Sequence, residues 1–115
     1  MAKYLEGNHH PGQALAPRAA YVAIDGDVAG YIAGHLTRRF NCDGELQYLY
    51  VTPACRRTGV ASELVRRLAG WFTSQGASKI CVNAADESAA AFYRRLGAVD
   101  LKPAWLVWND IQSTR

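Results

Sequence analysis

The first clear pattern along the chain is a pair of apolar runs joined by a tight turn. Apolar residues dominate Ala20–Ile24 and Val28–Leu36, and Asp25-Gly26-Asp27 separates them. An Asp-Gly pair between two apolar runs is a strong signal for a β-hairpin. A third strand is predicted at Glu45–Val51, which is dense in Leu, Tyr and Val. The first twenty residues show no clear period and are predicted to be mostly loop.

The pattern becomes helical after Gly59. From there to about Ser74, apolar residues recur every three or four positions, as on the buried face of an amphipathic helix. The next apolar run, Lys79–Asn83, is short and contains Ile, Cys and Val together, which predicts a strand. The chain therefore passes from strand to helix to strand in this region.

A second helix is predicted at Glu87–Leu96, because Asp86 can cap its start and Gly97 can end it. The tail that follows reads as two short strands broken near Pro103. A hairpin that leads into a strand–helix–strand unit implies a mixed sheet, since the hairpin pairs antiparallel and the crossover pairs parallel. The predicted class is α/β or α+β, with one domain over residues 1–115, a loop-rich segment at 1–19 and a core at 20–110.

Composition limits the class of protein and its expected cellular location. The chain has 115 residues, a net charge of +3 and half its residues apolar, which is typical of one small globular domain and does not demand a polyanion such as nucleic acid. Cys42, Cys55 and Cys81 form no CxxC motif, which argues against a disulfide scaffold and a zinc site. No stretch resembles a signal peptide or a membrane span. We therefore expect a cytoplasmic protein without a metal, and the initial Met favours a natural start over a clipped fragment.

The turn from Arg56 to Ala61 carries the main chemical signal. Gly59 lacks the Cβ that would keep an anion away from the backbone, and free N–H groups at a helix start attract phosphate. Arg56 and Arg57 add forked cationic donors. A P-loop is excluded, because no Lys follows the glycine. On spacing alone, an ordinary strand-to-helix connection explains the turn as well as a phosphate site does.

Two segments resemble the signatures of a known family. Arg56-x-x-Gly59-x-Ala61 matches the Q/R-x-x-G-x-G/A signature of the GNAT superfamily of acyl-CoA-dependent N-acetyltransferases, and LQYLYVTPACR before it is similar to that family's central strand and loop. AFYRRLGA at 91–98 resembles the second signature, a helix with FYxxLGF. The resemblance covers about residues 20–110. It implies a central mixed sheet with splayed middle strands and two main helices, with the N-terminal helices reduced or absent.

The resemblance also implies a site for acetyl-coenzyme A. The turn would hold the pyrophosphate, and the central strand would bind the pantetheine arm where strands 45–51 and 79–83 separate. Asp86 stands where relatives often carry an Asn that contacts this arm, so Ser88 or Asn83 would have to supply that contact. The residues assigned to the cosubstrate in this way are Leu49, Tyr50, Val51, Arg56, Arg57, Thr58, Gly59, Val60, Ala61, Ser88 and Tyr93.

Two residues are candidates for catalysis. Tyr93 occupies the position of the family's helix tyrosine, which protonates the departing thiolate, and a phenol pKa near ~10 lies close to that of a thiol. The alternative is a core tyrosine beside Phe92. Glu45 lies at the register where some relatives place a general base, but it could instead face water or pair with Arg38 or Arg39. Asp43 and a chain of water molecules are weaker alternatives for the base.

The acceptor and the partners are less constrained by the sequence. The acceptor is expected to be a small-molecule or peptide amine, and Trp105 and Trp108, which point to opposite faces of a strand, would place one indole in the core and leave the other free to line the acceptor pocket. Few residues precede the hairpin, so three alternatives are open: a compact loop replaces the family's N-terminal region, the acceptor site is unusually open, or a second subunit completes it. A homodimer is expected on this ground. His9 and His10 are assigned to a loop rather than to a metal. Two competing classes are a non-catalytic coenzyme A-binding module and, less favoured, a small nucleic-acid-binding domain.

Overall fold

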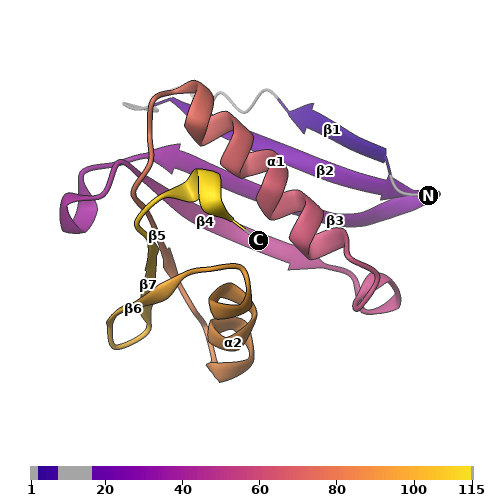
Figure 1. Ribbon diagram of the computed structural model, residues 1–115. Helices are drawn as coiled ribbons and strands as arrows, with labels where there is room; N and C mark the ends of the chain where they lie inside the picture. The colour runs from indigo at the N-terminus through magenta and orange to yellow at the C-terminus, as the bar shows by residue number, and fades with distance from the viewer. Residues whose placement is uncertain (1–2, 8–16, 115) are drawn as a thin grey trace.

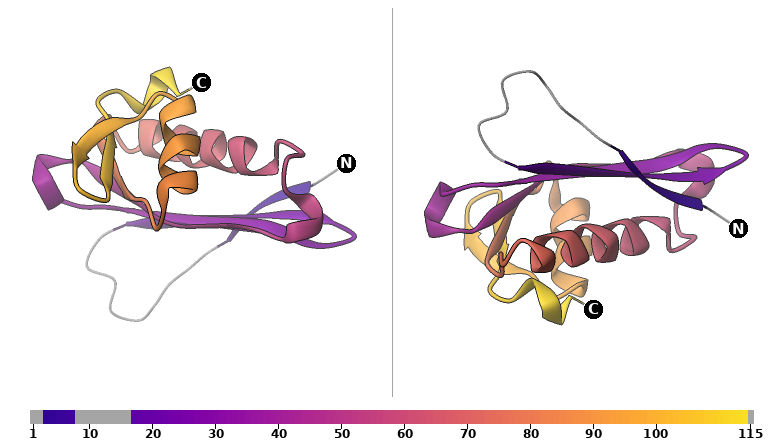
Figure 2. Two further views of the ribbon diagram at one scale, coloured as in Figure 1. Left: turned by 90° about the horizontal axis from the view of Figure 1, so that it is seen from below. Right: turned by 90° about the horizontal axis from the view of Figure 1, so that it is seen from above.

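The computed structural model describes residues 3–7 and 17–114, in which one mixed sheet carries both main helices on the same side (Figures 1 and 2). The sheet order is β1-β2-β3-β4-β5-β7-β6. The strands are β1 (Lys3–Gly7), β2 (Arg18–Asp25), β3 (Asp27–Leu36), β4 (Gly44–Val51), β5 (Ile80–Asn83), β6 (Val99–Lys102) and β7 (Trp105–Trp108), and the helices are α1 (Val60–Ser74) and α2 (Glu87–Arg95).

The centre of the sheet contains a parallel pair of strands that are hydrogen-bonded over only a short stretch. β4 and β5 run parallel and pair at three positions, Gly44, Glu45 and Leu46, whereas the other neighbouring strands are antiparallel. On the other side of β4, Ala33 pairs with Tyr48 and Gly34 pairs with Leu46, so Gln47 is an extra residue, a β-bulge. A bulge bends its strand, and this one comes directly after the last β4–β5 pair.

Helix α1 forms the main core by packing across β2, β3 and β4. Leu64, Leu68 and Phe72 are among its buried residues and follow the spacing seen in the sequence. Two strand glycines allow the close approach: a Cβ at Gly34 would lie 2.9 Å from Leu68 Cδ2, and a Cβ at Gly44 would lie 3.0 Å from Ile80 Cδ1 and closer still to the ring of Phe72. The helix therefore fits the sheet because these strand positions carry no side chain.

The sheet buries a second, smaller cluster on the face away from α1. Cys42, Cys81 and Val107 form it, with Phe40 and Trp105 packed against it. Trp108 belongs instead to the main core, where its indole N–H donates to Leu96 O at 3.3 Å. The two tryptophans of β7 therefore point to opposite faces, as predicted from their spacing.

Most predicted elements form within one or two residues of the expected bounds. The hairpin, the central strand, both helices and the two strands of the tail are all present. The prediction that the first twenty residues are mostly loop is wrong at residues 3–7, which form the edge strand β1 against β2. Five residues give no readable alternation, and their strand conformation comes from pairing with a distant segment. His9 and His10 lie outside the described residues.

Away from the helices, the β1–β4 part of the sheet exposes an aromatic surface. Tyr31, Tyr48 and Tyr50 share this face and are all exposed, and the rings of Tyr31 and Tyr50 lie 5.7 Å apart. Neither helix covers this face in Figure 2. Among the described helices, none has the length and apolar character needed to cross a membrane.

Candidate active site

The start of α1 presents backbone donors that no side chain satisfies. Gly59 is the N-cap, with φ of 84°, and its conformation is the left-handed one that glycine adopts without strain. The first helical hydrogen bond runs from Glu63 N to Gly59 O at 3.0 Å. Within the described parts of the chain, the N–H groups of residues 60–62 have no acceptor. Free N–H groups and the positive end of the helix dipole are features that attract an anion.

The turn before the helix is held by its own polar groups. Arg56 Nε donates to Val51 O at 3.1 Å, which ties the turn back to the end of β4. The Thr58 hydroxyl donates to Cys55 O. Arg57 has φ of 64°, an uncommon conformation for a residue with a side chain, and is exposed. The turn is thus shaped by local contacts that leave the helix start open.

A basic pocket of about 310 Å³ lies between this turn and α2. No atom lies within 4 Å of the place where a Cβ on Gly59 would stand, so the backbone there is open to a ligand. Three arginines contribute to the walls, two from the turn and one from α2. The lining residues are Val51, Cys55, Arg56, Arg57, Gly59, Ala61, Ser62, Phe92, Arg95 and Leu96.

The end of β4 leads from the centre of the sheet to this pocket. Beyond Leu46, no described strand pairs with β4 on the side of β5. Leu49 packs toward the α1 core, Tyr50 is exposed on the other face and Val51 is buried and lines the basic pocket. The splayed middle strands predicted from the sequence are therefore present, and on the side of β5 no described strand pairs with the backbone of residues 47–50, whereas Val51 O accepts from Arg56 Nε.

Glu45 is the buried charged residue of the described chain. It is 9% exposed and faces away from α1, beside Cys81 of β5 and opposite His35 of β3. Arg39 Nε lies 2.9 Å from Glu45 Oε1, so the predicted alternative of an ion pair with Arg39 is present. This ion pair lacks hydrogen-bond geometry. Oε1 therefore has no hydrogen-bond donor in the described chain. The carboxylate is therefore paired electrostatically, and its Oε1 can still accept a hydrogen bond.

His35 is a neighbour that the sequence did not single out for catalysis. Its Nδ1 lies 2.8 Å from Leu36 O, and because a carbonyl only accepts, Nδ1 carries the proton. The other ring nitrogen is then a free acceptor in the neutral ring. Glu45 and His35 form a cross-strand pair, so a carboxylate and an imidazole lie on one face near the point where β4 and β5 separate.

Tyr93 lies in the core, 6% exposed, rather than on the wall of the basic pocket. Its ring packs edge-on against Trp108 at 5.7 Å and against Phe92 at 5.4 Å. Burial raises its pKa from the ordinary value near 10 to about 12. The phenol therefore keeps its proton more strongly than an ordinary tyrosine. The sequence led us to expect a pKa close to that of a thiol, and burial raises the pKa of Tyr93 away from that value.

The remaining candidate residues differ in their hydrogen bonds, exposure and pKa. Asp43 Oδ2 accepts from Lys79 N at 2.9 Å and Ser78 N at 3.0 Å, and these bonds hold the pKa of its carboxyl below the usual value, which makes it a poor base. Ser88 is exposed in the first turn of α2 and does not line the basic pocket. Burial, and then the adjacent Cys42, raises the pKa of Cys81 to about 12, so this cysteine stays a thiol.

Comparison of the sequence with models of protein families shows which family has this arrangement. The model of the acetyltransferase (GNAT) family matches residues 3–98, which is most of the chain. The chain belongs to the GNAT acetyltransferase family. The match includes the anion-binding turn, the separated strands and the helix that carries Tyr93. No curated protein matches the sequence.

Solved structures share the GNAT fold with this acetyltransferase. A GNAT-family protein from Desulfovibrio desulfuricans superimposes with a TM-score of 0.73 at 16% identity, over 89% of this chain and 74% of that one. The KacTA–DNA complex gives a TM-score of 0.65 at 21% identity, over 89% and 72%. AtaTR bound with AcCoA gives 0.64 at 20% identity, over 84% and 69%. At these identities the likeness shows the fold.

Within this GNAT site, the pocket residues contributed by α2 were the part least visible in the sequence. Arg94 and Arg95 read as one basic pair, but α2 sends Arg95 to the basic pocket and Arg94 to Glu87 and Asp100 on another face. Helical spacing is the signal that separates them, since adjacent residues on a helix do not share a face. In the described residues, no group of three His, Cys, Asp or Glu side chains is placed to hold a metal ion.

The buried phenol predicts a specific pH dependence of stability. The folded pKa of Tyr93 is about 12 against 10 for an ordinary tyrosine, so the stabilisation is complete below pH 10 and is lost as the pH rises toward 12. Between about pH 9 and about pH 11, wild type should lose about 1 kcal/mol more unfolding free energy than Tyr93→Phe. Urea unfolding at both pH values measures this, with Tyr48→Phe as the surface control. Equal losses in wild type and Tyr93→Phe would contradict the assignment.

Proposed function

We propose that this GNAT protein is an acetyl-CoA-dependent N-acetyltransferase that moves an acetyl group to a primary amine by direct attack in a ternary complex. The observation that carries the proposal is the open start of α1. Its unpaired N–H groups and Gly59 lie in a pocket with three arginines, at the end of a strand whose backbone is free on one side. This combination suits a long ligand with a diphosphate at one end.

The residues present fit acetyl-CoA. A diphosphate needs several donors and positive charge, which the α1 start, Arg56, Arg57 and Arg95 provide. An amide-bearing arm needs an unpaired strand, which residues 47–50 provide on the side of β5. The acetyl thioester supplies an activated acyl group and a thiolate leaving group. Of the sequence-derived contacts, Ser88 has the least support, because it lies outside the basic pocket and belongs neither to β4 nor to the turn and start of α1.

Glu45 is the proposed general base. An alkylamine is mostly protonated at neutral pH, so a group near the acyl carbon has to accept its proton before attack. Glu45 has an oxygen without a hydrogen-bond donor, and Arg39 at 2.9 Å stabilises the ionised carboxylate that this role needs. Its position beside the last β4–β5 pair places it next to the gap.

Tyr93 is proposed to stabilise the departing thiolate. Its hydroxyl makes no hydrogen bond with any described residue, so it is available to a ligand. With a pKa of about 12 against about 8.5 for an ordinary thiol, the phenol donates a hydrogen bond to the sulfur more readily than it gives up its proton. Its role is thus closer to that of an oxyanion donor than to that of a full acid.

Direct attack is favoured over a covalent acetyl-enzyme. Cys42 and Cys81 are buried in the small cluster, and the raised pKa of Cys81 keeps it from acting as a thiolate nucleophile. Cys55 lines the basic pocket, at the pyrophosphate end rather than beside Glu45. We retain the prediction that the protein works in the cytoplasm.

A titration with acetyl-CoA tests the cosubstrate site. Wild type should bind with micromolar affinity by isothermal titration, and Arg56→Glu should bind at least about tenfold more weakly, because it replaces a charge-assisted donor by a repulsive carboxylate. Arg18→Glu makes the same change of charge at the exposed start of β2 and should bind like wild type. Equal weakening in both variants would show a general charge effect and contradict the proposed pocket. Absence of binding by wild type would overturn the proposal.

Turnover tests the role of Tyr93. Tyr93→Phe should lower kcat by about 10-fold or more, because it removes a donor used when charge develops on the sulfur, while acetyl-CoA affinity changes little. Release of free thiol with a panel of primary amines measures kcat. Unchanged kcat would assign Tyr93 to packing alone. Acetyl-CoA binding without any transfer by wild type would favour a non-catalytic coenzyme A-binding module.

A homodimer is proposed to complete the acceptor side. The support is the sheet face with Tyr31, Tyr48 and Tyr50, which neither described helix covers and which also carries Glu45. Light scattering should give about twice the chain mass of 12.6 kDa. A monomer mass at working concentration would contradict this part of the proposal and leave the acetyl-CoA site untouched.

A further inference from the structure

The segment between β3 and β4 is a closed loop that carries Arg39 and Phe40. Thr37 N donates to Asp43 O at 3.0 Å, which joins the two ends of the loop. Its middle is the single tight turn η1 (Arg39–Asn41). Phe40 has φ of 54°, an uncommon conformation for a residue with a large side chain. Such a conformation persists only where the surrounding contacts fix it.

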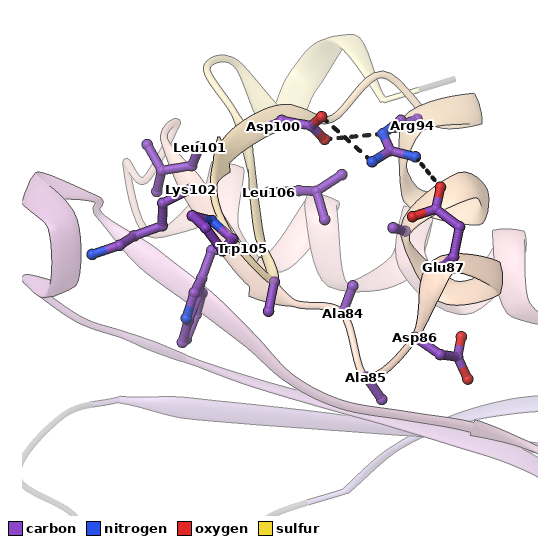
Figure 3. Close-up of a pocket in the computed structure, with 13 residues that line it drawn as sticks. Ala84, Ala85, Asp86, Glu87, Arg94, Asp100, Leu101, Lys102, Trp105 and Leu106 are labelled. Carbon is purple, nitrogen blue, oxygen red and sulfur yellow. Dashed lines mark hydrogen bonds and ion pairs between the residues drawn. The ribbon is translucent and has the colours of Figure 1, made fainter.

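Trp105 of β7 packs against this loop. Its ring lies 5.0 Å from the Phe40 ring, edge-on at 76°, and Arg39 Cζ lies 5.2 Å from the centre of the Trp105 ring. Figure 3, a close-up of the pocket between α2 and the β6–β7 hairpin, shows the Leu106 side chain directed toward α2 and the Trp105 indole directed away from it. The indole therefore lies beside the small cluster on the face of the sheet away from α1.

The guanidinium that stacks on Trp105 is also the cation beside Glu45. Arg39 Nε lies 2.9 Å from Glu45 Oε1, and the Glu45 side chain is 11% exposed against 53% for Arg39. An ion pair with an exposed, mobile partner contributes little, whereas a buried carboxylate needs a nearby cation to stay ionised. Because a planar guanidinium stacks on an aromatic ring, Trp105 restricts the Arg39 side chain to the position beside Glu45.

The stack explains how the ion pair leaves the carboxylate able to accept a hydrogen bond. The Arg39 guanidinium lies over the Trp105 ring as well as beside the carboxylate, so its orientation is not set by the carboxylate alone. Its Nε comes within 2.9 Å without the geometry of a hydrogen bond, and Glu45 Oε1 has no donor in the described chain. Glu45 thus gains a stabilising charge, and Arg39 does not use its acceptor capacity.

The titratable neighbours of Glu45 on the adjacent strands do not supply this charge. His35, its cross-strand neighbour on β3, directs its Nδ1 proton to Leu36 O. Cys81, its neighbour on β5, stays a thiol because burial, and then the adjacent Cys42, raises its pKa to about 12. Neither strand therefore offers a fixed cation to the carboxylate.

The other charged residues of the loop and the hairpin face elsewhere. Backbone hydrogen bonds first, and the charge of Arg38 last, hold the pKa of Asp43 below its usual value. Lys102 Nζ lies 4.6 Å from the centre of the Phe40 ring. Among the described residues, Arg39 is the ion-pair partner of the buried carboxylate.

We infer that Arg39 and Trp105 are positioning residues for the proposed general base: Trp105 holds the Arg39 guanidinium beside Glu45, and that charge keeps the carboxylate ionised and free to accept the proton of the amine. As a statement about catalysis, this rests on the proposed acetyl transfer; as a statement about the charge of Glu45, it does not. The tryptophan that the sequence left free to line the acceptor pocket thus acts on the base through Arg39.

Titration of Glu45 in the protein alone tests the role of Arg39. Carboxyl ¹³C NMR follows the ionisation of Glu45, and loss of the signal in Glu45→Gln assigns it. In Arg39→Gln the midpoint should move to higher pH by about 0.5 pH unit or more, because a nearby opposite charge favours the ionised carboxylate and the exposure of Arg39 reduces this effect. Arg38→Gln removes the same charge one residue away and should leave the midpoint within about 0.2 pH unit of wild type.

Double variants test whether Trp105 acts through Arg39. Trp105→Leu should move the Glu45 midpoint in the same direction, whereas Trp105→Phe keeps an aromatic face and should restore most of the wild-type value. In the Arg39→Gln background, Trp105→Leu should add no further shift, because the group that Trp105 holds is absent. Arg39→Lys keeps the charge without the planar stack, at an exposed position, and should match Trp105→Leu. It tests the stack even if Trp105→Leu does not fold.

The pH profile of turnover tests the consequence for catalysis. With a primary amine that wild type acetylates, the acid limb of kcat/KM should move to higher pH in Arg39→Gln by the same interval as the NMR midpoint. The plateau at high pH should stay close to that of wild type, whereas a purely structural role would lower it. Acetyl-CoA affinity should be unchanged, because Arg39 does not line the basic pocket.

An unmoved midpoint in Arg39→Gln would overturn the inference, as would equal shifts from Trp105→Leu with and without Arg39. A moved midpoint with an unmoved acid limb would overturn its catalytic part. Failure of the proposed function is distinguishable from these results. Absence of acetyl transfer by wild type, with a midpoint that still depends on Arg39, would remove the transferase and keep the positioning of the Glu45 charge.

Discussion

The short pairing between β4 and β5 decides where every other part of the site lies. Parallel strands gain stability from each paired residue, yet these two pair at only three positions before they separate. β4 continues to Val51 and delivers the chain to the turn before α1, whereas β5 ends at Asn83 and delivers it to α2. The gap therefore has the start of one helix at one end and the other helix at its side. Had the strands stayed paired, the backbone of residues 47–51 would have been used by the sheet itself.

The bulge at Gln47 assigns side chains to the two faces on either side of that gap. Leu46 and Leu49 both pack toward α1 although they are three residues apart, which a regular strand does not allow. The same extra residue puts Glu45 on the face of Tyr48 and Tyr50. A carboxylate buried there would be costly without a cation, and Arg39, from the segment that also buries Cys42, offsets this cost. The face on which Glu45 is buried and its ion pair with Arg39 thus depend on one irregular strand position.

Helix α2 carries opposite charges at its two ends. Its N-terminal turn carries Asp86 and Glu87, which favour the positive end of the helix dipole, and its C-terminal turn carries Arg94 and Arg95, which favour the negative end. Within the C-terminal turn, Arg94 pairs with Glu87 and Asp100, and Arg95 lines the basic pocket. Tyr93 lies in the core, where burial keeps its proton in place. A helix of nine residues therefore links folding, charge and the proposed chemistry.

The sequence by itself determined the hairpin, both helices with their caps, and the glycine-bearing turn before α1, because these depend on local periodicity and on residues such as Gly59 and Asp86 that act within one turn of the chain. It did not determine β1, whose five residues become a strand only by pairing with β2. Nor did it show that Arg94 and Arg95 serve different pockets, or that Tyr93 would be buried enough to change its pKa. These features depend on contacts between distant segments, so only the tertiary structure, which sets burial, dielectric and the side each residue faces, could decide them.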